Sequence, residues 1–197
     1  MCSATSRVLV AQELLAPFLE RIVAKAQSIK VAGPLEEGTE MGPLVNQAQY
    51  QRVINHIEAG KKAGARLLCG GQRPADQPRG YFLQPAVFTQ VPLDSALWRE
   101  EIFGPVLCVR GFSSEAEAIA LANDSQFGLV ASVVSGDSEA ADRIANALQA
   151  GMVWINAPQV IFPQTSWGGY KQSSLGRELG PWGLQAFQEI KHVVRAV

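Results

Sequence analysis

The sequence carries little net charge and contains no long apolar run. Its 17 basic and 18 acidic side chains give a formal net charge of -1, which argues against a nucleic-acid-binding protein or a protein held on membranes by basic residues. No apolar run reaches the roughly 18 residues needed to span a bilayer. We therefore expect a globular protein with neither a nucleic-acid nor a membrane partner.

Cysteine and histidine are also scarce, and their spacing excludes several kinds of site. Cys2, Cys69 and Cys108 are far apart and form no CxxC pair, so a disulfide framework or a zinc knuckle is excluded and a reducing, cytoplasmic compartment is favoured. Cys69 and Cys108 lie inside apolar runs, where a thiol packs as a small hydrophobic group. His56, near the polar side of its predicted helix, and His192 have no partner at metal-ligand or catalytic-triad spacing, so we expect a structural or a solvated role for each. We expect no metal site.

The chain has enough apolar residues for a core, since 47% of its 197 residues are hydrophobic. Apolar periodicity predicts an amphipathic helix over 12–29. A second helix is predicted to begin at Asn46, with Gln49 in the capping-box position. Residues 65–69 read as a short strand. Residues 81–91 read as an extended segment, which Pro85 and the flanking prolines indicate to be an edge strand or a long cover strand.

Residues 106–156 have the most regular pattern. Three apolar runs alternate with two helical segments, which predicts a βαβαβ unit with an open parallel sheet covered on both faces. Ser138 is expected to cap the second of these helices, which would run to Ala150 with Gly151 at the C′ position. Ligands bind beyond the carboxyl ends of such strands, so the segment after Asn156 is a candidate site wall.

Three stretches contain residues that could carry chemistry. Cys2 is followed by hydroxyl side chains and by Arg7, which could expose a reactive thiolate, but from the residues alone a cysteine near a terminus is more often without a role. Residues 100–105 place two carboxylates and Phe103 on a turn, which could also be a solvated loop with Phe103 tucked beneath it. Residues 167–178 combine aromatic, glycine and charged residues in a long loop of the kind that often carries function. Neither GxGxxG nor GxxxxGK[ST] spacing is present.

Four ordered motifs resemble the aldehyde dehydrogenase superfamily. The family's nucleophile motif contains a cysteine that is followed by S/T-A-x-x-R. Cys2-Ser3-Ala4-Thr5-Ser6-Arg7 is similar to this part of the motif. Its other matching motifs, E-I-F-G-P-V, N-x-x-x-Y/F-G-L and G-x-V-W-I-N, resemble residues 101–106, 123–129 and 151–156. The loop with Trp167 is most similar to the betaine-aldehyde and amino-aldehyde dehydrogenase branch.

The resemblance implies a role for each matched residue. Cys2 would be the nucleophile that adds to an aldehyde, and its backbone N–H would bind the resulting oxyanion. Glu101 would hold the nicotinamide ribose of NAD or NADP, and Phe103 would position the ring. Trp167 would line the aldehyde pocket, although it could also be a core residue. Met152 would line the same pocket, where its bulk disfavours a trimethylammonium group.

The resemblance also implies a domain organisation. Residues 1–188 would be a catalytic domain truncated at its N-terminus, and residues 189–197 a strand that joins the oligomerisation sheet of a neighbouring subunit. The cofactor-binding domain and the general-base glutamate would lie outside this chain. Two hypotheses follow. In the first, the chain is part of a homo-oligomeric oxidoreductase and works with its N-terminal half. In the second, it is a split or decayed fragment without activity of its own that docks at most into an intact homologue.

Overall fold

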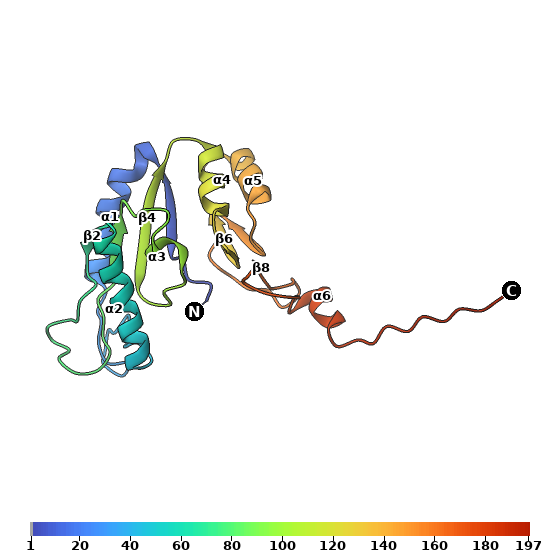
Figure 1. Ribbon diagram of the computed structural model, residues 1–197, viewed down its shortest axis with the longest axis horizontal. Coiled ribbons are helices and arrows are strands. Elements are labelled where there is room, and N and C mark those ends of the chain that lie inside the picture. The colour runs from blue at the N-terminus through green and yellow to red at the C-terminus, as the bar shows by residue number, and fades with distance from the viewer. Residues whose placement is uncertain (1) are drawn as a thin grey trace. The chain divides into compact units, whose positions relative to one another are not determined.

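The computed structural model describes residues 2–197 and divides the chain into two compact units, Met1–Leu121 and Ala122–Val197. Each unit is described by itself, and its elements can be followed in Figure 1. Within the described residues, no helix combines the length and the hydropathy needed to cross a membrane.

The first unit contains a four-stranded sheet in the order β1-β4-β3-β2. Strand β4 pairs in parallel with β1 and with β3, and β2 pairs antiparallel with β3. The sheet is therefore open and mostly parallel, as predicted. The strands are β1 (Arg7–Ala11), β2 (Arg66–Cys69), β3 (Ala86–Thr89) and β4 (Val106–Phe112).

Helices cover both faces of this sheet, because alternate side chains of its strands point in opposite directions. Val87 and Val109 pack with the apolar stripe of α1, whereas Phe88 and Cys108 pack with α2 and α3. Both faces of this sheet are therefore covered, but it is not the sheet predicted over residues 106–156, of which only β4 belongs to it. The helices of this region are α1 (Leu15–Ser28, after a 3-10 turn at Gln12–Leu14), α2 (Gln47–Lys62), α3 (Ala96–Arg99) and α4 (Glu115–Asn123).

The prediction that Pro85 marks a sheet edge is wrong. Strand β3 lies between β4 and β2, and all four of its residues are buried. Pro85 comes directly before the strand, so its missing N–H removes no ladder bond. The first strand residue, Ala86, donates its N–H to the carbonyl of Pro105 at 2.8 Å.

The second unit contains one βαβ motif and a short antiparallel pair. Strand β6 (Val130–Val133) is followed by α5 (Ser138–Ala147) and by β7 (Met152–Ile155), which pairs with β6 in parallel. Strand β5 (Phe127–Gly128) pairs antiparallel with β8 (Tyr170–Lys171). A single βαβαβ sheet over 106–156 was expected, but β4 pairs only with β1 and β3 in the described structure.

The predicted ends of α5 need correction at both termini. Asp137, rather than Ser138, is the N-cap, and its carboxylate accepts the N–H of Ala140 at 3.1 Å. The helix ends at Ala147, so Gly151 is not its C′ residue. A Cβ atom at Gly151 would lie 1.6 Å from the carbonyl oxygen of Gly168, so this glycine lets two backbone segments approach closely.

The last residues follow a short helix, α6 (Gly180–Gln185). Residues 189–197 form no strand in this chain, and all of them are exposed. The expected strand is therefore absent from the isolated chain. Whether these residues join the sheet of a neighbouring subunit stays a prediction.

Candidate active site

Cys2 lies in a turn that leads into β1, and its side chain is exposed. The other two cysteines are buried, as the sequence predicted. Burial raises the pKa of the Cys108 thiol to about 12, although the nearby Arg7 acts in the opposite direction. Among the three thiols, Cys2 alone is open to a substrate.

The sheet register brings Cys2 and the loop over residues 100–104, hereafter the EEIFG loop, to the same end of the sheet. Arg7 of β1 is opposite Cys108 of the parallel strand β4. Cys2 and Phe103 each lie five residues before one member of this pair. Figure 1 shows the segment that leads into β1 near the end of the sheet where β4 begins. This end carries the amino termini of both strands.

Helix α2 holds the backbone of the EEIFG loop in place. The side-chain amide of Gln49 donates to the carbonyl oxygens of Ile102 and Phe103, each at 3.0 Å. The Arg52 guanidinium donates to the carbonyl oxygen of Glu101 at 2.6 Å. A Cβ atom at Gly104 would lie 2.5 Å from Val53, so the loop passes directly against the helix.

The fixed backbone leaves the two predicted cofactor-binding side chains open to solvent. Glu101 is exposed, and Phe103 is 52% exposed rather than tucked beneath the loop. Phe103 has a φ of 56°, a left-handed conformation that is unfavourable for a bulky residue unless its surroundings impose it. The two hydrogen bonds from Gln49 provide that constraint, because they hold the carbonyl groups immediately before and after the Cα of Phe103.

His56 of α2 contacts Glu100, the first residue of the EEIFG loop. Its Nε2 lies 3.1 Å from a carboxylate oxygen of Glu100, and its Nδ1 lies 2.9 Å from the carbonyl oxygen of Arg52. The sequence placed His56 near the polar side of its helix, in a structural or a solvated role. The imidazole is instead buried, and its two partners give it the structural role.

The second unit holds the two predicted pocket residues. Trp167 is half-buried, and its ring lies 6.3 Å from that of Trp154 at an angle of 45°. Its backbone forms two 2.7 Å hydrogen bonds with Glu178. The Trp154 indole is anchored in turn by a 2.9 Å bond to the carbonyl of Val160.

Met152 opens strand β7 and is half-buried. It is two residues before Trp154, so both side chains leave the strand on the same face. Met152 therefore shares a face of β7 with the tryptophan that supports Trp167. Asn156 comes directly after β7. Its side-chain oxygen accepts the N–H of Ser135 at 3.0 Å, and its side-chain nitrogen donates to the carbonyl oxygen of Ser135 at 2.7 Å.

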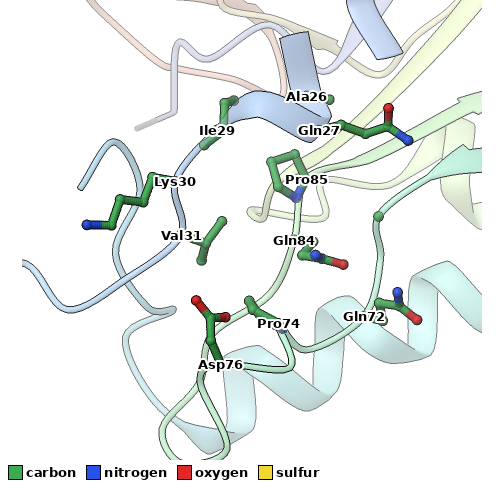
Figure 2. A pocket seen from close by; sticks show the side chains of 11 residues that line it. Ala26, Gln27, Ile29, Lys30, Val31, Gln72, Pro74, Asp76, Gln84 and Pro85 are labelled. Atoms are coloured by element: carbon green, nitrogen blue, oxygen red, sulfur yellow. The ribbon is translucent and has the colours of Figure 1, made fainter. Parts of the chain in front are cut away.

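A cavity of about 420 Å³ lies elsewhere in the first unit, beside the end of α1. Figure 2 shows that Lys30 extends away from the other lining side chains, in agreement with its hydrogen bond to the carbonyl of Glu37. None of the predicted site residues lines this cavity. Within residues 2–197, no group of three or more acidic, histidine or cysteine side chains is arranged to hold a metal ion.

Sequence reasoning missed the residues that support the site. Gln49 was noted only as a capping residue, and its side chain instead reaches a loop 53 residues further along the chain. Arg52 gave no signal, because a polar residue on a helix surface is ordinary. Trp154 was part of a matched motif. It follows Met152 by two residues, and this spacing could have indicated that the two side chains lie on the same face of a strand.

Comparison with known proteins identifies the family of this chain. The model of the aldehyde dehydrogenase family matches residues 1–193. The chain is 49% identical to aminoaldehyde dehydrogenase 2, peroxisomal, of Malus domestica over 197 residues, which are all of this chain and 39% of that protein. It is 48% identical to the chloroplastic betaine aldehyde dehydrogenase of Amaranthus hypochondriacus over 195 residues, 99% of this chain and 39% of that one.

Solved structures give the same result. Betaine aldehyde dehydrogenase from Staphylococcus aureus in complex with NAD+ superposes with a TM-score of 0.92 at 41% identity, over 95% of this chain and 38% of that one. The NAD+ complex of an aldehyde dehydrogenase from Bacillus cereus gives 0.93 at 43% identity, over 97% and 38%. This chain thus spans about two fifths of the length of its relatives. It belongs to the aldehyde dehydrogenase family.

Proposed function

We propose that the chain supplies the nucleophile and part of the nicotinamide site of an NAD(P)-dependent aldehyde dehydrogenase. The proposed substrate is betaine aldehyde or an amino-aldehyde, the classes named in its relatives. The main support is the register of β1 and β4, which brings the exposed Cys2 and the EEIFG loop to one end of the sheet.

Cys2 acts first. Its thiolate sulfur bonds to the aldehyde carbon, and the carbonyl π electrons move to oxygen. The backbone N–H of Cys2 donates a hydrogen bond to that oxyanion. When the carbonyl re-forms, hydride leaves the carbon and a thioester remains on Cys2. A water that gives up a proton to a base outside this chain then attacks the thioester carbon. The C–S bond breaks, which releases the acid and restores the Cys2 thiolate.

The EEIFG loop fits part of a nicotinamide site. The exposed Glu101 carboxylate would accept hydrogen bonds from the two ribose hydroxyls, and the Phe103 ring offers an apolar face. The bound NAD or NADP supplies the acceptor for the hydride. Because Gln49 and Arg52 occupy the loop carbonyls, the loop keeps these side chains oriented without help from the ligand.

Trp167 and Met152 are proposed to line the aldehyde pocket. A protonated amine on the face of an indole gains about 0.5–2 kcal/mol. The bulk of Met152 makes the smaller amino-aldehydes better candidates than trimethylammonium aldehydes. Trp154 keeps the orientation of Trp167, since the two rings pack at 6.3 Å.

Assembly and location complete the proposal. In the full-length enzyme, residues 189–197 would pair with a neighbouring subunit and give a homo-oligomer. Deletion of this segment should then shift the sedimentation of that enzyme to a smaller species. A cytoplasmic location rests on three unpaired cysteines, while two of the relatives carry the words peroxisomal and chloroplastic in their names.

Joining this chain to the unmatched part of the Malus domestica relative tests the function. The fusion should form NADH or NADPH with an amino-aldehyde, and more slowly with betaine aldehyde. A neutral aldehyde of similar size serves as the control for the cation. A folded fusion that reduces neither cofactor with any of these aldehydes would contradict the proposal and favour the inactive-fragment hypothesis.

A further inference from the structure

The chain that follows β7 folds back toward the strand it has just left. The indole N–H of Trp154, in β7, donates to the carbonyl oxygen of Val160 at 2.9 Å. The main-chain hydrogen bond beside it is local, since the Val160 N–H donates to the carbonyl oxygen of Pro158 at 2.8 Å. The Trp154 side chain therefore connects the segment over residues 157–162 to the strand.

Asn156 fixes the point at which this segment leaves β7. Its side-chain amide holds both backbone groups of Ser135, at 3.0 and 2.7 Å, and these bonds do not involve Trp154. Its φ of 49° is left-handed, a conformation that asparagine tolerates better than most residues. Val160 lies only four residues beyond this fixed point, so the bond from Trp154 sets the path that the segment takes.

The tethered segment carries apolar side chains that are open to solvent. Three consecutive residues are between 41% and 55% exposed: Val160, Ile161 and Phe162. Trp154 and Met152 leave β7 on the same face, and the Trp154 ring packs against that of Trp167. The bond to the Val160 carbonyl therefore brings the segment to the side of β7 that holds both proposed pocket residues.

We propose that Trp154 is a positioning residue whose indole N–H holds residues 160–162 as an apolar wall for the carbon chain of the aldehyde. The identity of the ligand rests on the function proposed above. The ring and the N–H of Trp154 have separate tasks. The ring supports Trp167, which faces the cation, whereas the N–H sets the position of the wall.

Trp154→Phe separates these two tasks in the full chain, because it keeps an aromatic ring and removes the N–H. We expect the NMR order parameters of residues 160–162 to fall from about 0.85 to below about 0.6, while those of β7 are unchanged. Trp98→Phe is the matched control. It also removes a buried indole N–H, but one that has no hydrogen-bond partner in the part of the chain that the structure describes.

The native chain offers a second measurement, which stays informative if Trp154→Phe does not fold. The Trp154 indole proton should exchange with water at least about tenfold more slowly than that of Trp182, whose side chain is 65% exposed. Equal exchange of the two indole protons, or unchanged order parameters in Trp154→Phe, would overturn the inference.

In the fusion enzyme, Trp154→Phe should raise the KM for the aldehyde about two- to tenfold, the factor that one neutral hydrogen bond provides. The kcat should change by less than about twofold, because the wall binds the substrate and the transition state alike. The neutral control aldehyde should show the same rise, since an apolar wall contacts the carbon chain. An unchanged KM for both aldehydes would refute the wall. An inactive fusion with the expected loss of order would instead refute the proposed function and leave the tether intact.

Discussion

At the scale of single residues, Gly151 sets how closely the start of β7 approaches the loop before β8. A methyl group there would lie 1.6 Å from the carbonyl oxygen of Gly168, which is backbone and cannot rotate away. We expect Gly151→Ala to lower the free energy of unfolding by at least about 3 kcal/mol. Urea unfolding followed by tryptophan fluorescence measures this, since Trp154 and Trp167 belong to the same unit.

Gly136 is the matched control for this change. It lies between β6 and α5, and a Cβ atom there would meet nothing within 4 Å. Gly136→Ala should therefore leave the unfolding midpoint unchanged or raise it slightly. Equal losses in the two variants would show that the close approach to Gly168 is not what requires glycine at 151.

Cys108 makes the stability of the fold depend on pH at the alkaline end. Burial raises its pKa from 9.0 to about 12, so the folded state favours the neutral thiol. Below pH 9 the thiol is protonated in both the folded and the unfolded state, and its full contribution is present. As pH rises from 9 to 12 the unfolded thiol ionises first, and about 4 kcal/mol of stability is lost.

Cys108→Ala separates this loss from the titration of other groups. The variant should be less stable at pH 8, because it leaves a small cavity. Between pH 9 and 11 its unfolding free energy should fall less steeply than that of the native chain. Parallel curves over this range would rule out the buried thiol as the source.

At the scale of helices and strands, α5 gives a direct test of its cap. The carboxylate of Asp137 accepts the Ala140 N–H at 3.1 Å, whereas Ser138 is already the first helical residue. Asp137→Ala should cost about 1 kcal/mol, and Ser138→Ala much less. Urea denaturation of the two variants compares them, and a larger loss in Ser138→Ala would contradict the assignment.

Local patterns predicted most elements, because capping and periodicity act over a few residues. The start of α2 is an example, since Asn46 accepts the Gln49 N–H at 2.8 Å as its position suggested. The choice between Asp137 and Ser138 could not be made from the sequence, as either side chain can cap a helix. The interior position of β3 also escaped prediction, because strand order depends on contacts between distant segments.

At the scale of the whole molecule, the motifs predicted the family and the candidate site residues. They did not predict the residues of α2 that contact the EEIFG loop. Cys2, Glu101 and Phe103 were identified by resemblance to short motifs, and the register of β1 and β4 brings their segments to one end of the sheet. The contacts of Gln49, Arg52 and His56 with the EEIFG loop cross between 44 and 54 positions of sequence. No local pattern contains that information, so only the fold reveals it.

The most direct test of the central claim is the effect of Cys2→Ser on kcat/KM of the fusion enzyme with an amino-aldehyde. If Cys2 is the nucleophile, kcat/KM should fall by at least about a thousandfold, because a serine hydroxyl without an activating base is a poor substitute for a thiolate. Cys69→Ser is the control, since that thiol is buried on the sheet and should affect stability more than rate. Activity within tenfold of the native fusion in Cys2→Ser would contradict the account.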